Sequence, residues 1–209
     1  MQLFELGKVA IMKVDIVCIG DTEKITESEI RAIYTKQALK DGLKKYLEIM
    51  DELHRVNVAE HKEFQKKYNH FYRMRQRKPE YYQVYYNYME KMKKNKDLLT
   101  FDDVFFYIKK ETGRCEVSFS SKMLATINPS KPVWDSFVLE NLGIKKIYPT
   151  AKDREKKIVA VYHQICDWYE QFMKTEEADL IIEVFDEIYP NTNITNLKKI
   201  DLFLWQNRK

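Results

Sequence analysis

The chain has 209 residues, of which 44% are hydrophobic and 33% charged, with a formal net charge of +4. This length and composition exclude an intrinsically disordered protein and predict one compact domain, 1–209, with a sizeable core. No apolar run approaches the roughly 18–20 uncharged residues that cross a bilayer, and no secretory signal pattern is visible, so we expect no membrane partner and a cytoplasmic location.

The scarcity of helix breakers predicts an all-α fold made of many helices. The sequence holds only five glycines and five prolines, whereas a sandwich or barrel needs turn residues about every 8–12 positions. Residues 1–20 are the least helical part, because the apolar runs at 9–12 and 14–19 fit either a short hairpin or an irregular arm.

The first helices are expected to form a basic, tyrosine-rich lobe over residues 21–96. A capping pattern starts the first helix near Thr26, and its apolar stripe continues to about His54, as one helix or as two joined near Gly42. Another helix is expected over 60–75. Pro79 is expected to begin the next one, because proline is favoured in the first helical turn.

The remaining helices are expected to form a second lobe over residues 97–209. Thr100 is expected to cap a helix that Gly113 ends. The apolar spacing then predicts helices over 118–127, 136–142, 151–173, 176–188 and 196–205.

The positive charge is concentrated in one part of the chain. Residues 62–96 hold 11 Lys and Arg against three Glu, a net charge of +8 that leaves −4 for the remainder. Within this segment Arg73, Arg75, Arg77 and Lys78 are candidates for phosphate contacts, and the tyrosines at 81–88 could stack on unpaired bases. DNA is therefore the predicted partner. The alternative is that these tyrosines face the core and the charges form an ordinary solvated surface.

The cysteines and histidines do not indicate a metal or cofactor site. Cys18, Cys115 and Cys166 are too widely spaced for a metal-binding pair or a disulfide framework, so we expect reduced thiols. The four histidines have no partners at metal-ligand spacing, and no glycine-rich phosphate or dinucleotide motif occurs. We therefore expect neither a metal nor a cofactor.

One segment has the residue types of a catalytic site. Residues 119–138 read Phe-Ser-Ser-Lys-Met-Leu-Ala-Thr-Ile-Asn-Pro-Ser-Lys-Pro-Val-Trp-Asp-Ser-Phe-Val. Over about residues 101–144 the chain resembles a degenerate helix-hairpin-helix DNA glycosylase, especially the 8-oxoguanine type. In that comparison Lys122 stands in the place of the nucleophilic lysine and Asp135 in the place of the aspartate. The interval of 13 positions is shorter than is usual in the family, and Val-Ser-Phe-Ser-Ser replaces its glycine-rich hairpin.

The resemblance implies a base-excision reaction and a site for it. Lys122 would attack the sugar C1′ carbon and form a Schiff base, provided that its pKa is lowered, while Asp135 would assist proton transfer and stabilise the developing positive charge. Ser120 and Ser121 would contact DNA at the hairpin. Phe119, Trp134 and Phe137 would line the pocket that receives the extruded base.

A structural interpretation of the same residues remains open. An Asp that follows Pro-Val-Trp and precedes an apolar helix is a sound N-cap whether or not it takes part in catalysis. Lysines near helix starts are commonly solvated surface residues. On this alternative the protein is a non-enzymatic, all-helical interaction protein.

Overall fold

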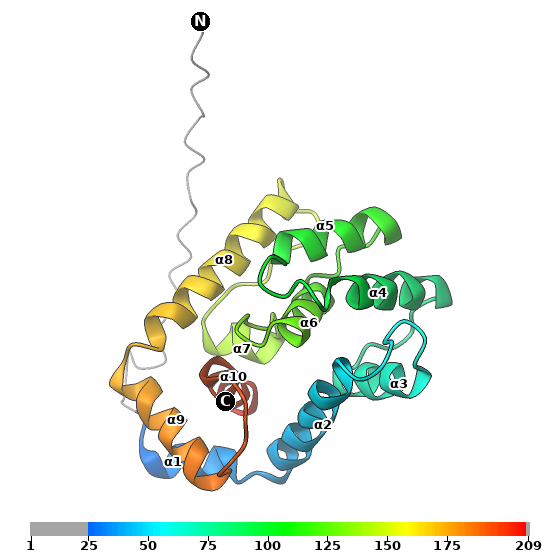
Figure 1. Cartoon of the computed structure of the whole chain (residues 1–209). Helices are drawn as coiled ribbons and strands as arrows, with labels where there is room; N and C mark the ends of the chain where they lie inside the picture. Colours follow the sequence, from blue (N-terminus) through cyan, green and yellow to red (C-terminus); the bar gives the residue numbers. More distant parts are fainter. Residues whose placement is uncertain (1–24, 208–209) are drawn as a thin grey trace, which may run out of the picture.

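The computed structural model describes residues 25–207, which fold into ten α-helices, and no strand occurs in that range (Figure 1). The expected all-α, multi-helix fold is confirmed. The predictions for residues 1–20 lie outside the described residues. Among the residues that are described, no helix has both the length and the apolar character that a membrane span requires.

The first five helices begin and end close to the predicted positions, with one difference. They are α1 (Glu27–Tyr34), α2 (Gln37–Leu53), α3 (Lys62–Phe71), α4 (Pro79–Met92) and α5 (Phe101–Thr112). The expected caps at Thr26 and Thr100 are both capping boxes, and Gly113 ends α5 in the left-handed conformation. The chain turns between α1 and α2 at Thr35, whose hydroxyl donates to the Arg31 carbonyl at 2.8 Å, and Gly42 lies inside α2.

The second half of the chain supplies the other five helices. They are α6 (Val117–Ile127), α7 (Ser136–Asn141), α8 (Arg154–Phe172), α9 (Glu176–Ile188) and α10 (Asn196–Gln206). Threonine side chains cap α9 and α10, and Asp135 caps α7. Each of these caps satisfies backbone N–H groups that have no partner within the helix.

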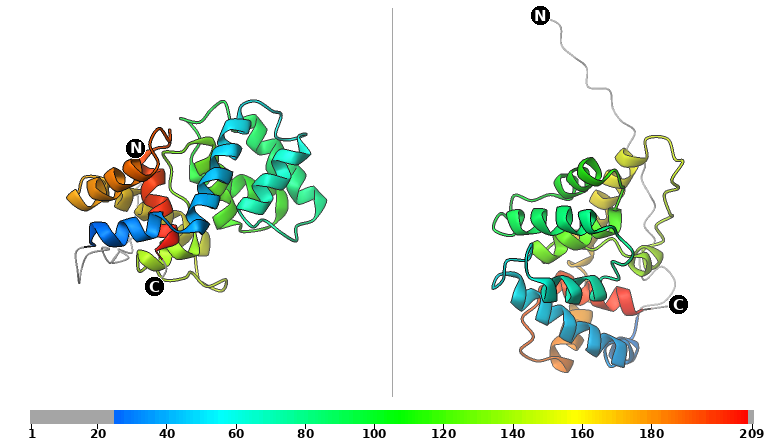
Figure 2. Two further views of the ribbon diagram at one scale, coloured as in Figure 1. Left: turned by 90° about the horizontal axis from the view of Figure 1, so that it is seen from below. Right: turned by 90° about the vertical axis from the view of Figure 1, so that its right-hand side faces the viewer.

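The buried side chains form two hydrophobic clusters that meet along α2 and α8. One cluster joins α1 and the start of α2 to α7, the second half of α8, α9 and α10. The other joins the end of α2 to α3, α4, α5, α6 and the start of α8. The left view of Figure 2 places α9 and the α3–α4 pair at opposite ends of the molecule. This division differs from the lobes expected at 21–96 and 97–209, because α1 packs on the C-terminal helices.

Helix α10 lies at the centre of the first cluster. Figure 1 shows it enclosed by α1, α2, α7 and α9, and nine of its eleven residues are buried. The helix nevertheless carries Lys198, Lys199 and Asp201 among those buried positions. Charged groups are almost never buried without a partner, so these three side chains need an explanation.

Candidate functional site

The turn between α6 and α7 brings the two residues of the predicted catalytic pair together. The Trp134 N–H donates to Ser121 Oγ at 2.9 Å, which folds the turn back onto α6 next to Lys122. The Tyr162 hydroxyl of α8 donates to the Pro132 carbonyl at 2.9 Å and holds the turn from the other side. Asp135 thereby begins α7 beside the first part of α6.

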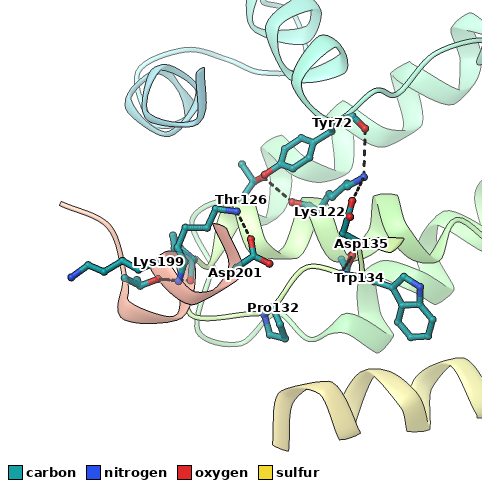
Figure 3. Close-up of polar contacts among 12 residues, drawn as sticks. Tyr72, Lys122, Thr126, Pro132, Trp134, Asp135, Lys199 and Asp201 are labelled. Carbon is teal, nitrogen blue, oxygen red and sulfur yellow. Dashed lines mark hydrogen bonds and ion pairs between the residues drawn. The ribbon is translucent and has the colours of Figure 1, made fainter. Parts of the chain in front are cut away.

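Lys122 and Asp135 face each other at the point where this turn ends. The Lys122 Nζ atom lies 3.9 Å from Asp135 Oδ2, and the two side chains are 12% and 21% exposed (Figure 3). The amine also donates to the Tyr72 carbonyl at 3.5 Å, and the Phe119 ring centroid lies 5.3 Å away. Both contacts to oxygen are long, so the amine is held loosely by its neighbours.

The structural role proposed for Asp135 is present as well. Asp135 Oδ1 accepts the backbone N–H of Phe137 at 3.0 Å, which is the N-cap of α7. One carboxylate oxygen therefore caps the helix while the other faces Lys122. The two interpretations of Asp135 do not exclude each other.

The surroundings of Lys122 favour the uncharged amine. Burial lowers the pKa of Lys122 below its ordinary value, and the carboxylates of Asp135 and Asp201 oppose this effect. The positive charges of Arg73 and Lys198 act in the same direction as burial. A lysine becomes a nucleophile when desolvation or a neighbouring cation lowers its pKa in this way.

Lys122 and Asp135 both line a cleft of about 750 Å³ between the two clusters. Helices α2, α6, α7, α8 and α10 contribute to its walls, together with the loops on either side of α7 and the end of α3. The predicted pocket residues Phe119, Trp134 and Phe137 line it, together with three further aromatic residues, Phe71, Tyr72 and Trp205. The volume and the apolar walls are typical of ligand pockets.

A second Lys–Asp pair lies in the wall of the same cleft. Lys198 Nζ lies 2.6 Å from Asp201 Oδ2, with the side chains only 9% and 6% exposed. Lys198 Nζ also lies 4.8 Å from the centroid of the Tyr46 ring on α2. The third buried charge of α10, Lys199, pairs with Asp186 of α9 at 2.6 Å, and its side chain points away from Lys122 in Figure 3.

The four predicted phosphate-binding cations have different surroundings. Arg73 is exposed and lines the cleft, and Arg75 and Lys78 are exposed on the same loop between α3 and α4. Arg77 is instead only 20% exposed, and its guanidinium donates to both carboxylate oxygens of Glu116, at 3.1 and 3.2 Å. The structure therefore gives Arg77 a role in fixing this loop to the start of α6.

The predicted contacts of Ser120 and Ser121 with DNA are wrong for these side chains. Both serines have no exposed surface, because the α6 face that carries them is turned into the core. Ser121 Oγ donates to the Ser118 carbonyl at 2.9 Å and accepts the Trp134 N–H. Ser121 therefore shapes the turn, and neither hydroxyl is accessible to a DNA phosphate.

The tyrosines after Pro79 belong to the core, as the structural alternative proposed. Four of the five side chains are buried, and Tyr82 is half-buried. The buried ones are Tyr81, Tyr85, Tyr86 and Tyr88. The Tyr85 hydroxyl donates to the Phe119 carbonyl at 2.8 Å and so connects this core to α6. These rings cannot stack on bases without unfolding α4.

Sequence reasoning missed several residues that line the cleft. Lys146 comes from the segment that joins α7 to α8, and Arg154 is the first residue of α8. Lys198, Asp201 and Trp205 come from α10. A signal for the last group was present, because two lysines and an aspartate interrupt an otherwise apolar helix. In the described part of the chain, no group of three or more His, Cys, Asp or Glu side chains is arranged to hold a metal ion.

Comparison with known proteins yields no assignment. No protein-family model matches the chain, and no significant match is found among curated proteins or solved structures.

Proposed function

We propose that this protein binds DNA and excises a damaged base, with Lys122 as the nucleophile and Asp135 as its partner. The observation that carries the proposal is the partly buried Lys122 amine, 3.9 Å from the Asp135 carboxylate in a cleft large enough for a nucleobase. The resemblance of residues 101–144 to helix-hairpin-helix DNA glycosylases supports the same reaction. Since that resemblance covers about a fifth of the chain, the geometry is the stronger argument.

The reaction can be written with this chain's own groups. The lone pair of the uncharged Lys122 amine attacks C1′, the glycosidic bond breaks, and its electron pair leaves with the base, which takes up a proton. Asp135 Oδ2 accepts the proton that the lysine nitrogen loses and stabilises positive charge on the sugar. The sugar ring then opens: the nitrogen lone pair forms the C1′=N bond of a Schiff base, the C1′–O4′ bond breaks, and O4′ takes the proton that Asp135 accepted.

The cleft has features that suit an extruded nucleotide. Extrusion costs a few kcal/mol and is repaid by stacking and by contacts in the pocket. Phe119 offers aromatic surface beside the amine, and Trp134 lines the same cleft. Arg73 and Lys146 supply positive charge where the cleft meets solvent. Phosphates on either side of the extruded nucleotide would be attracted to these cations.

Borohydride trapping tests the proposal. The full chain is incubated with duplexes that carry 8-oxoguanine, uracil, an alkylated purine or an abasic site, and borohydride reduces any Schiff base to a stable adduct. We expect an adduct with at least one duplex, located at Lys122 by mass spectrometry and absent from the Lys122→Ala variant. Lys145→Ala is the matched control, because it removes an exposed lysine that does not line the cleft and keeps the nucleophile. No adduct with any duplex would reject the enzyme.

A non-enzymatic interaction protein is the second candidate, and the capping bond from Asp135 Oδ1 to the Phe137 N–H favours it. If the protein is an interaction protein, Asp135 caps α7, and the cleft binds a partner without covalent chemistry. DNA affinity that does not change with salt, together with failure to trap an adduct, would support it, since phosphate contacts make binding fall steeply as salt rises.

A further inference from the structure

The ion pair of Lys198 and Asp201 calls for a functional explanation. Its atoms are 2.6 Å apart and its side chains less than 10% exposed, on a helix whose other cleft-facing residues are Leu202 and Trp205. Removing two charges from water is expensive, and a well-packed apolar pair of similar size is often as stable or more stable. Stability alone is therefore a poor reason for this pair.

The pair lines the same cleft as Lys122 and Asp135. The charged groups that act on Lys122 come from every side of the cleft: Asp135 from the start of α7, Arg73 from the loop after α3, and Lys198 and Asp201 from α10. The amine also donates to the Tyr72 carbonyl. Asp201 is thus a second carboxylate that attracts the amine, and it is the one that already has a cation of its own.

We propose that Lys198 is a positioning residue, which holds the Asp201 carboxylate in an ion pair and so leaves Asp135 as the carboxylate that faces the Lys122 amine. Where it concerns base excision, this inference rests on the proposed function. The protonation of the Lys122 amine can be measured independently of that function. Lys198 acts in two ways: it binds Asp201 Oδ2 directly, and its positive charge opposes a second positive charge on Lys122. A neighbouring cation that favours an uncharged lysine is a known route to a nucleophilic amine.

The geometry around Lys198 suits this role. Its ammonium group lies over the Tyr46 ring, which favours the charged form. Burial lowers the pKa of Lys198, but Asp201, Tyr72 and Tyr46 together raise it above its ordinary value. The two lysines of one cleft therefore face different carboxylates, Asp135 for Lys122 and Asp201 for Lys198.

The experiment measures the reactivity of Lys122 directly and needs no DNA. The full chain is treated with formaldehyde and cyanoborohydride across a range of pH, and mass spectrometry follows methylation at Lys122. Because only the uncharged amine reacts, the rate at each pH reports its protonation. Removal of Lys198 in Lys198→Met should slow methylation about tenfold near neutral pH, the effect of one pKa unit. Asp201→Asn should speed it, and Lys198→Arg should retain the native profile.

Two further variants keep the result interpretable if an unpaired buried charge prevents folding. The double variant Lys198→Met with Asp201→Asn has no charge at either position, and its profile should lie between those of the single variants. Lys199→Met is the matched control, since Lys199 is the next residue of α10 and pairs with Asp186 instead. It should leave the Lys122 profile unchanged.

The outcomes separate this inference from the proposed function. Opposite shifts of the Lys122 profile in Lys198→Met and Asp201→Asn support the positioning role, even if no DNA adduct is ever trapped. The positioning role is overturned if the Lys122 methylation profile is the same in the native chain, in Asp201→Asn and in the double variant. Circular dichroism must first show that all three are folded. A DNA adduct formed with unchanged kinetics by these variants would retain the enzyme and reject the role of Lys198.

Discussion

The backbone N–H of Trp134 donates to the hydroxyl of Ser121 at 2.9 Å, across 13 positions of the chain. This bond connects the residue before Asp135 to the residue before Lys122. The distance between the amine and the carboxylate is therefore set by a side chain that contacts neither of them.

Replacement of Ser121 by alanine should loosen this arrangement. The Trp134 N–H loses its partner, and we expect a loss of about 1–2 kcal/mol in the free energy of unfolding, measured with denaturant. The pH profile of Lys122 methylation should also change, because Asp135 is no longer held beside the amine. Ser130→Ala, at an exposed position of the same turn, is the control. An unchanged Lys122 profile in folded Ser121→Ala would show that other contacts position Asp135.

Two substitutions at Asp135 separate its capping role from its role beside Lys122. Asparagine is as good an N-cap as aspartate, so Asp135→Asn should change stability by a few tenths of a kcal/mol, whereas Asp135→Ala should cost about 1 kcal/mol. Both variants remove the carboxylate charge near Lys122 and should reduce trapping of a DNA adduct to a similar extent. If Asp135→Asn trapped the adduct at the native rate, Asp135 would be a cap alone.

The loop after α3 and the segment after α7 should contribute to DNA affinity through their charges. We expect Arg73→Asn with Lys146→Gln to lower the slope of log affinity against log salt by about 0.9 for each phosphate that the variant no longer neutralises. Asparagine is chosen because Arg73 has a positive φ of 55°, which asparagine tolerates. The control is Lys91→Gln with Lys94→Gln, which removes two exposed charges of the segment 62–96 that do not line the cleft. Equal effects of both double variants would indicate general attraction to a basic surface.

The helices were predictable because their signals are local. Capping residues, prolines and apolar spacing lie within a few residues of one another, so α4 and α9 begin at the predicted residues. The boundary between α1 and α2 was missed because a helix-interior glycine looks like a break. Gly42 instead lies inside α2, and a Cβ atom there would make an ordinary contact with the Trp205 ring of α10 at 3.6 Å.

The candidate site was predictable only in part because its members come from distant segments. The sequence placed Lys122 near Asp135 through one turn, and it placed three aromatic residues near them. It gave no indication that α10, 76 positions after Lys122 at Lys198, completes the same cleft. It also assigned Ser120, Ser121 and Arg77 to a DNA surface, because burial and the partner of a charge depend on tertiary packing.

Substitution of Gly42 by alanine should stabilise the protein. Glycine in a helix interior costs about 0.5–1 kcal/mol relative to alanine, and the added methyl group would make an ordinary contact with Trp205. We expect a gain of that size in the free energy of unfolding. Gly113→Ala should act in the opposite direction, because Gly113 has a φ of 70° that alanine adopts with strain. A loss of stability in Gly42→Ala would show that the packing between α2 and α10 has no room for a methyl group.

The buried tyrosines should make the fold sensitive to alkaline pH. Burial raises the pKa of Tyr68 and of Tyr85 well above the ordinary value, and their hydroxyls lie 2.8 Å apart inside the second cluster. A group whose pKa is raised by folding stabilises the native state fully below its unfolded pKa, about 10 for tyrosine, and this contribution is lost as pH rises through and beyond that value. The free energy of unfolding should therefore fall steeply above about pH 10.

Tyr85→Phe should flatten this fall while losing about 1–2 kcal/mol at neutral pH, since the Phe119 carbonyl loses its donor. Replacement of the exposed Tyr148 by phenylalanine should leave both quantities unchanged, and an identical alkaline profile in Tyr85→Phe would exclude Tyr85 as a source of the effect.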